Sequence, residues 1–218
     1  MHGMTLWLYP GVRLASEGLV FVLPLVGLTC VSGLYGWWLS AVLLGVLSVG
    51  VALFFRDPER VIPGTPGAIV SPADGRVMDI VMESNHTRRI SIFLSPLDVH
   101  VNRAPYSGTV RDVVYTPGKF LAAYRPEASA VNEANSLTLE GSAGQFIVKQ
   151  IAGVLARRIV CRVHPGDVLE KGQRYGLIRF GSRTDLVLPA EVDIVARIGD
   201  VVRGGETILA FLKEPQGA

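Results

Sequence analysis

A long run without charged residues lies near the N-terminus of this chain and limits how the chain can fold. From Gly18 to Phe55 the sequence contains no Asp, Glu, Lys or Arg, and this run is 38 residues long. A helix needs about 20 consecutive apolar residues to cross the hydrocarbon core of a bilayer. The run therefore accommodates two tilted or slightly short helices, joined by a turn near residues 33–38, where glycine, tyrosine and tryptophan gather.

We predict that residues 1–57 form an N-terminal membrane helical hairpin. Such a hairpin satisfies its backbone hydrogen bonds internally, as a bilayer requires. The basic residues that flank the run, Arg13, Arg56 and Arg60, lie at its open end. The positive-inside rule then places both ends, and the domain that follows, on the cytoplasmic side of the cell membrane. The alternatives are a buried helical hairpin in a soluble protein and a hairpin that enters one leaflet only.

The remaining residues, 58–218, have the pattern of a β-rich domain. Three prolines between residues 58 and 66 prevent the second helix from continuing. Short runs of Val, Ile and Leu then recur between Gly, Pro and Asp. A modest helical or irregular stretch is expected only over Gly118–Ala130. The clearest predicted strands are Gly75–Val81, Arg89–Leu94, Gly108–Tyr115, Ser136–Leu139, Gln145–Ile151 and Arg158–Val163.

Two segments of this domain resemble each other. Residues 165–172 read Pro-Gly-Asp-Val-Leu-Glu-Lys-Gly, and residues 198–205 read Ile-Gly-Asp-Val-Val-Arg-Gly-Gly. Each is a Gly-Asp turn followed by the start of a strand and a second glycine turn. Such paired units are found in lipoyl- and biotinyl-type barrels, which consist of two similar four-strand halves. We therefore predict a mainly β (α+β) domain, a lipoyl- or hybrid-motif-like barrel.

Composition argues against several classes of function. The formal net charge is +2, which is too small to indicate nucleic-acid binding. The two cysteines, Cys30 and Cys161, form no disulfide framework or metal motif, and the four histidines lack the spacing of metal ligands. We therefore expect no metal. A weak attraction to anionic lipid headgroups is compatible with this charge.

Three short segments combine reactive side chains with special backbone. Ser182 directly follows Gly181 between two apolar strands, so that its hydroxyl can attack the glycine carbonyl. His100 stands between an apolar strand and a polar segment closed by proline, where it can take and return a proton. Asp74 can orient and charge this histidine. Taken singly, each has a structural alternative: a hairpin turn at Gly181-Ser182, another at Asp74-Gly75, and a hydrogen-bonded histidine.

Taken together, these segments resemble a known family. The predicted hairpin is followed by Ser-Pro-Ala-Asp-Gly (71–75), Phe-Leu-Ser-Pro-Leu-Asp-Val-His-Val-Asn-Arg-Ala-Pro (93–105) and Phe-Gly-Ser-Arg (180–183), in this order. From about residue 10 to the C-terminus the chain is similar to the short, archaeal-type form of the phosphatidylserine decarboxylase proenzymes.

The resemblance implies an activity and a way of maturing. It implies self-cleavage between Gly181 and Ser182 into a β chain of residues 1–181 and an α chain of residues 182–218. Ser182 would become a pyruvoyl cofactor, which serves the decarboxylation of phosphatidylserine to phosphatidylethanolamine. The implied partners are the phospholipid substrate, the membrane and the two chains of the same proenzyme. The oligomeric state, including a homodimer, stays open.

The resemblance also implies catalytic roles for Ser182, His100 and Asp74. The chain departs from longer members of the family at Arg103, where they have a second histidine. His100 would then serve both self-cleavage and turnover. Candidates for binding the headgroup phosphate are Arg103, Lys119 and Arg183.

Three other functions are compatible with parts of this sequence. A membrane-tethered lipoyl-type barrel that acts as a non-enzymatic adaptor would explain the hairpin and the repeat, but not the contexts of His100, Asp74 and Gly181-Ser182. A biotin or lipoate carrier is disfavoured because residues 184–194 contain no lysine. A decarboxylase of an ether-linked phosphoserine lipid would use the same chemistry.

Overall fold

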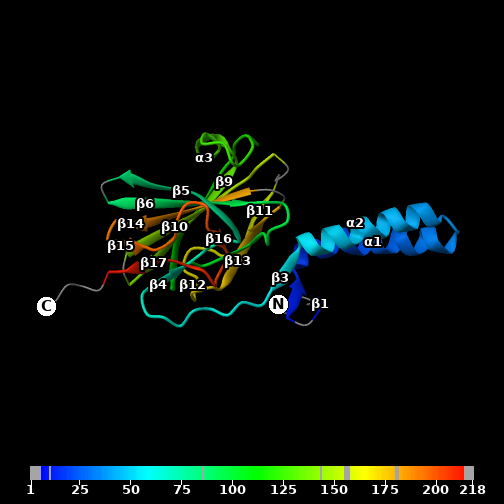
Figure 1. The fold of residues 1–218 in the computed structure, drawn as a ribbon, viewed down its shortest axis with the longest axis horizontal. Coiled ribbons are helices and arrows are strands. Elements are labelled where there is room, and N and C mark those ends of the chain that lie inside the picture. The colour runs from blue at the N-terminus through cyan, green and yellow to red at the C-terminus, as the bar shows by residue number, and fades with distance from the viewer. Residues whose placement is uncertain are drawn as a thin grey trace. The chain divides into compact units, whose positions relative to one another are not determined.

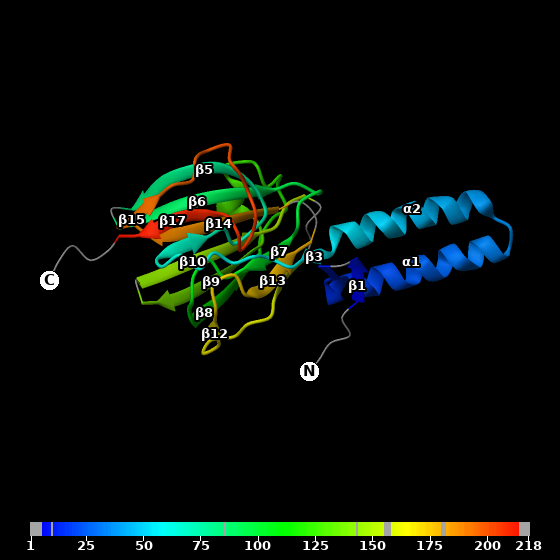
Figure 2. The same ribbon diagram turned by 60° about the horizontal axis from the view of Figure 1, so that its bottom comes forward.

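Two apolar helices dominate the first of two compact units, Met1–Glu59 and Arg60–Ala218, into which the chain divides. The computed structural model describes residues 6–9, 11–84, 86–142, 144–154, 158–179 and 182–213. Helix α1 (Ser16–Leu34) is long and apolar enough to cross a membrane, and α2 (Trp38–Phe54) is shorter and carries no charged residue. Only residues 35–37 separate the two helices, which pack against each other (Figures 1 and 2).

A small antiparallel sheet joins the two ends of this helix pair. Strands β1 (Leu6–Tyr9) and β2 (Val12–Leu14) precede α1, and β3 (Arg56–Pro58) follows α2 and pairs with β2. Beside the sheet, Nη2 of Arg13 lies 2.9 Å from Oε1 of Glu59. The predicted extended segment after the second helix is therefore confirmed.

The second unit is mainly β, as predicted. Its strands are β4 (Ala68–Val70), β5 (Gly75–Ser84), β6 (Thr87–Leu94), β7 (Val101–Arg103), β8 (Gly108–Thr116), β9 (Ala134–Gly141), β10 (Gly144–Ile151), β11 (Ile159–Cys161), β12 (Val168–Leu169), β13 (Arg174–Ile178), β14 (Ser182–Pro189), β15 (Val192–Ile194), β16 (Val201–Val202) and β17 (Ile208–Leu212). All six strands predicted from the sequence are among them. The stretch expected to be helical or irregular contains one short helix, α3 (Ala128–Val131).

One curled antiparallel sheet forms the body of this unit (Figures 1 and 2). Among the described residues it has eight strands, in the order β12-β8-β9-β10-β14-β6-β5-β16. Two smaller sheets have the orders β11-β13-β7 and β15-β17-β4. Successive residues of a strand point to opposite faces. One face of the large sheet therefore buries an apolar core, which includes Ile90, Ile92, Leu139, Leu186 and Leu188.

The pairing scheme of the second unit is symmetric about β10 and β14. Beyond β10 lie β9, β8 and β12, and beyond β14 lie β6, β5 and β16, while the sheet β11-β13-β7 matches the sheet β15-β17-β4. The described strands thus form two equivalent seven-strand halves. We name the half made of β7–β13 (residues 101–178) the inserted half. The split half consists of β4–β6 (residues 68–94) and β14–β17 (residues 182–212).

The two repeated Gly-Asp segments occupy equivalent places in these halves. The first leads into β12 and the second into β16, the two edge strands of the large sheet. The backbone N–H of Gly166 donates to the carbonyl of Val110, and that of Gly199 donates to the carbonyl of Val77, both at 2.8 Å. The φ angles of the two glycines are 97° and 96°. The repeat predicted from the sequence is confirmed, with seven strands in each half rather than four.

The halves differ in how their central strands are connected. In the inserted half, β9 and β10 follow each other in the chain. In the split half, the whole inserted half separates the equivalent strands β6 and β14, which nevertheless pair from Leu94 opposite Ser182 to Thr87 opposite Pro189. The chain therefore leaves the split half after Leu94 and returns to it at Ser182, at the same end of the sheet.

The hairpin-turn interpretation of Asp74-Gly75 is wrong. The flanking strands β4 and β5 do not pair with each other, because β4 pairs with β17 while β5 pairs with β6 and β16. Gly75 is needed for another reason. Its φ is 146°, and a Cβ atom at this position would collide with the carbonyl oxygen of Phe93 on β6. Residues 71–74 therefore link two sheets.

Candidate active site

Ser182 is the first residue of β14 and is fully buried. Its Oγ atom has no hydrogen-bond partner among the described residues. Leaving a buried hydroxyl unpaired costs about 1–3 kcal/mol, so a hydroxyl of this kind calls for an explanation such as a catalytic role. Gly181, the other residue of the predicted cleavage site, lies outside the described residues.

His100 lies in the segment by which the chain leaves the split half. Leu94 lies opposite Ser182 in the pairing of β6 with β14. The segment 95–100, which follows Leu94, therefore starts next to Ser182, the predicted nucleophile. The imidazole is buried, and its Nδ1 lies 2.9 Å from the carbonyl oxygen of Asp98. When Nδ1 carries a proton and donates it to this carbonyl, Nε2 is left as the basic nitrogen. The role of His100 as the base for Ser182 stays a prediction.

The Asp74 carboxylate accepts hydrogen bonds from Arg60 and from the backbone of Gly204. One carboxylate oxygen accepts from Nη2 of Arg60 and the other from the backbone N–H of Gly204, both at 2.7 Å. Burial raises the pKa of Asp74 above its ordinary value, Arg60 opposes this rise, and Asp98 adds a smaller upward contribution. The described hydrogen bonds include none between Asp74 and His100, so that contact also stays a prediction.

Arg183 belongs to a charged cluster on the face of β14 opposite Ser182. Its Nε donates to Oδ1 of Asp185 at 2.6 Å, and its Nη2 donates to Oγ of Ser91 at 2.8 Å. All three side chains are buried, and Ser129 donates a further hydrogen bond to Asp185 at 2.8 Å. Because its charge is compensated inside the protein, Arg183 is less suited to bind a headgroup phosphate than its sequence position suggests.

Asn102 has a place in the site that sequence reasoning missed. Its Nδ2 donates to Oγ1 of Thr184 at 3.2 Å and to the carbonyl of Pro72 at 3.4 Å. These three residues belong to the three segments that carry the predicted catalytic side chains, so Asn102 connects all of them. Its place inside the conspicuous motif at 93–105 was a signal, but only the strand pairing identifies its partners.

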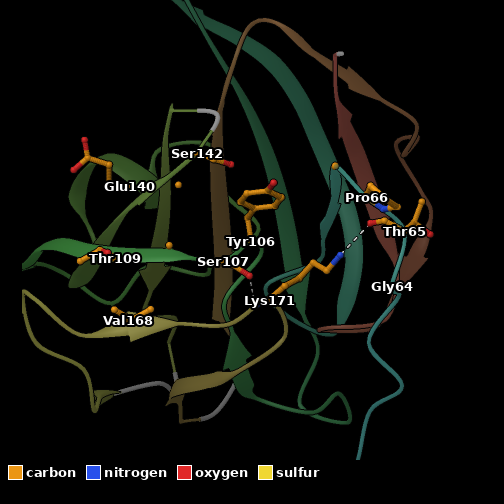
Figure 3. Close-up of a pocket in the computed structure, with 13 residues that line it drawn as sticks. Gly64, Thr65, Pro66, Tyr106, Ser107, Thr109, Glu140, Ser142, Val168 and Lys171 are labelled. Carbon is orange, nitrogen blue, oxygen red and sulfur yellow. Dashed lines mark hydrogen bonds between the residues drawn. The ribbon is translucent and has the colours of Figure 1, made fainter. Parts of the chain in front are cut away.

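A pocket of about 460 Å³ lies beside the inserted half. Figure 3 shows Lys171 at its wall, where the side chain donates to the carbonyl of Thr65 at 3.2 Å and the backbone N–H donates to Oγ of Ser107 at 3.0 Å. The described lining contains none of the predicted catalytic residues. Ser107 precedes β8 as Asp74 precedes β5, so the pocket marks the place in the inserted half that corresponds to the Asp74 region.

Comparison with known proteins gives one consistent result. A family model described as phosphatidylserine decarboxylase matches residues 49–210. A phosphatidylserine decarboxylase proenzyme of Geotalea uraniireducens is 46% identical over 205 residues, which are 91% of this chain and 96% of that relative. Proteins of the same name from Symbiobacterium thermophilum and Nitratidesulfovibrio vulgaris are 47% and 43% identical over 92% and 96% of this chain, and over 96% and 99% of their own lengths.

Proposed function

Because the chain belongs to the phosphatidylserine decarboxylase family, we propose that it converts phosphatidylserine into phosphatidylethanolamine and carbon dioxide with a pyruvoyl group made from its own Ser182. The main support for this proposal is Ser182. Its hydroxyl is fully buried and has no hydrogen-bond partner among the described residues, and the residue begins the strand that pairs with Leu94, just before the His100 segment. The chain is a decarboxylase of the proenzyme type.

Self-cleavage at Gly181-Ser182 would supply the pyruvoyl group. Oγ of Ser182 attacks the Gly181 carbonyl carbon, its proton passes to a base, and the C–N bond breaks as the nitrogen takes up a proton, which leaves an ester. Removal of the Cα proton of residue 182 then breaks the Cβ–O bond and releases the Gly181 carboxylate. Water finally replaces the nitrogen at Cα, and the nitrogen leaves as ammonia. No oxidant or reductant is consumed.

We assign the proton transfers of this reaction to His100. A buried imidazole can take the serine proton and return it to the departing nitrogen, because its ordinary pKa lies near neutrality. The Asp98 carbonyl beside Nδ1 supports this role, since it fixes the ring and the tautomer. The carboxylate of Asp74, held by Arg60, would stabilise the positive charge that develops on the histidine.

A pyruvoyl group at residue 182 would supply an acceptor for the electron pair that is released as carbon dioxide leaves. It would be bonded covalently to the N-terminal end of β14, where Leu94 lies opposite. The residues present fit this group, because the Ser182 hydroxyl has a donor without an acceptor among the described residues. A keto group has no donor, so the conversion removes the unsatisfied hydrogen.

We also propose that α1 and α2 anchor the enzyme to the cell membrane with the β unit on the cytoplasmic side, and that this unit is a lipoyl-type hybrid barrel. Both helices expose large apolar side chains, among them Leu34 and Leu39. The hydroxyls of Thr29 and Ser48 donate to carbonyls of their own helix, at 2.8 and 2.7 Å, which a lipid environment favours. Extracting a lipid costs about 0.8 kcal/mol per methylene, so an enzyme at the surface avoids that cost.

The intact mass of the purified full chain, measured beside Ser182→Ala, tests the proposal. We expect two fragments from the wild type, the smaller being residues 182–218 with an N-terminal pyruvoyl group, and a single uncut chain from Ser182→Ala. Vesicles that contain phosphatidylserine should yield phosphatidylethanolamine with the wild type only. A wild-type chain that stays whole in detergent and in such vesicles would contradict the proposal.

A further inference from the structure

Four buried polar side chains form a hydrogen-bonded chain across the second unit. Nδ2 of Asn135 donates to Oε1 of Gln150 at 3.0 Å, and Nε2 of Gln150 donates to Oδ1 of Asn102 at 2.8 Å. Nδ2 of Asn102 continues the chain to Oγ1 of Thr184 at 3.2 Å. Gln150 lies directly opposite Thr184 in the pairing of β10 with β14 and opposite Asn135 in that of β10 with β9. The four residues are at most 3% exposed.

The symmetry between the halves shows that the fold does not need polar residues at three of these positions. Strands β10 and β14 are equivalent, so the third residue of one corresponds to the third residue of the other, and likewise the seventh. Strands β7 and β4 are also equivalent, because β7 pairs with β13 in the same way as β4 pairs with β17. The equivalents of Asn102, Thr184 and Gln150 are therefore Ile69, Phe146 and Leu188. These three apolar side chains are fully buried in the hydrophobic core. At three equivalent positions, one half thus has hydrogen-bonded polar side chains where the other half has apolar core residues.

The polar chain ends beside the cleavage site. Thr184 lies two residues after Ser182 in β14 and points to the same face of the strand, because side chains alternate along a strand. Asn102 lies two residues after His100, and its amide also reaches the carbonyl of Pro72, two residues before Asp74. One amide group thereby ties the His100 segment to the strand that begins with the nucleophile.

We propose that Asn102, through its hydrogen bond to Thr184, is a positioning residue that holds the His100 segment at the distance and orientation that self-cleavage requires. The inference rests on the proposed function, because it presupposes that Ser182 cleaves the chain. Displacements of about 1 Å can slow such a reaction about 100-fold. A buried bond across the two segments therefore acts on the rate even though neither partner exchanges a proton with the scissile bond.

The exchange of a single hydroxyl tests this role. In the full chain, Thr184→Val removes the acceptor of the Asn102 bond and keeps the shape of the side chain, whereas Thr184→Ser keeps the acceptor. We expect the 182–218 fragment to appear at least about tenfold more slowly in Thr184→Val, and within about twofold of the wild-type rate in Thr184→Ser. Thr138→Val, on neighbouring strand β9, is the matched control and should cleave at the wild-type rate.

A second comparison separates positioning from folding. Asn102→Leu should slow cleavage, and the double variant Asn102→Leu/Thr184→Val should be no slower than the slower single variant, because both single changes remove the same hydrogen bond between Asn102 and Thr184. The unfolding temperature of each variant is measured in the uncleavable Ser182→Ala background. Cleavage at the wild-type rate in Thr184→Val, equal slowing in Thr184→Ser, or slowing that follows a lowered unfolding temperature would each overturn the inference. Failure of the wild type itself to cleave would instead contradict the proposed function.

Discussion

The turn that precedes β5 and the turn that precedes β8 occupy equivalent positions in the two halves and differ in charge. In the split half, Oδ1 of Asp74 accepts from the backbone N–H of Gly204 at 2.7 Å. In the inserted half, Oγ of Ser107 accepts from the backbone N–H of Lys171 at 3.0 Å. An oxygen acceptor at this position is thus what the turn needs, and a neutral serine provides it.

The additional feature of the Asp74 turn is a partly buried carboxylate with a counterion. Arg60 pairs with Asp74 at 2.7 Å and with Glu206 at 3.3 Å, and burial still raises the pKa of Asp74. Asp74 is costly to ionise, and a serine makes the equivalent hydrogen bond in the inserted half. A catalytic role is therefore the best explanation for a carboxylate at this position. This difference supports the proposal that the charge of Asp74 serves the reaction, while its hydrogen bond to Gly204 serves the turn.

The two halves also differ at the junction of their central strands. In the inserted half, β9 and β10 are consecutive in the chain. In the split half, the equivalent strands β6 and β14 are separated in the chain by the whole inserted half. The proposed cut lies at this return. Since β14 stays paired with both β6 and β10, cleavage does not remove any strand pairing, and the two chains are expected to remain associated.

The largest expected effect comes from converting the Asp74 turn into the Ser107 type. Asp74→Ser is combined with Arg60→Met, because loss of the Asp74 carboxylate would remove the closer of the two ion pairs that hold the Arg60 side chain, those with Asp74 and Glu206. We expect self-cleavage at least about 100-fold slower, as for the loss of a group that assists proton transfer, with the unfolding temperature nearly unchanged. Appearance of the 182–218 fragment is followed by mass. The control variant Arg60→Met keeps the Asp74 carboxylate and should still cleave itself. If the double variant cleaved as fast as Arg60→Met, the proposed role of the Asp74 carboxylate would be contradicted.

A smaller effect is expected at the glycines that follow these turns. A Cβ at Gly75 would collide with the carbonyl oxygen of Phe93, and a Cβ at Gly108 would lie 2.6 Å from that of Glu140. Only Gly75 also has a positive φ, of 146°. Alanine should therefore cost about 1–3 kcal/mol at Gly108 and more at Gly75, which adds backbone strain of about 1–3 kcal/mol. Urea unfolding in the Ser182→Ala background measures both, and an equal or reversed order would contradict this reasoning.

The smallest expected effect is on the pH dependence of stability. The folded protein binds a proton at Asp74 more readily than the unfolded chain does, because the pKa is raised. This group therefore lowers the free energy of unfolding as pH rises from its ordinary pKa through the raised one. The triple variant carries Asp74→Ser and Arg60→Met in the Ser182→Ala background. Its free energy of unfolding, relative to that of Ser182→Ala, should increase from pH 4 to pH 7. Urea unfolding at the two pH values measures the difference; a relative loss would show that the pKa is lowered instead.

The sequence supported predictions wherever local pattern decides structure. The charge-free run, the proline-marked exit and the alternating strands follow from short-range periodicity, and the structure has apolar helices and strands at those places. The Gly-Asp repeat even indicated the internal symmetry. The Asp74-Gly75 turn was misjudged, because the same dipeptide serves a tight hairpin and a link between sheets, and only the partners of the flanking strands distinguish them.

The amino-acid sequence was sufficient to identify the reactive residues, and its similarity to a family of proenzymes indicated the reaction that they are proposed to perform. Their hydrogen-bond partners are known only from the folded structure: Arg60 for Asp74, Asp185 for Arg183, and Thr184 for Asn102. Asn102 and Thr184 are 82 residues apart in the chain, so their contact depends on strand order and register, which local sequence patterns do not specify. A shift of one residue in β14 would exchange the face that carries Ser182 and Thr184 for the face that carries Arg183 and Asp185.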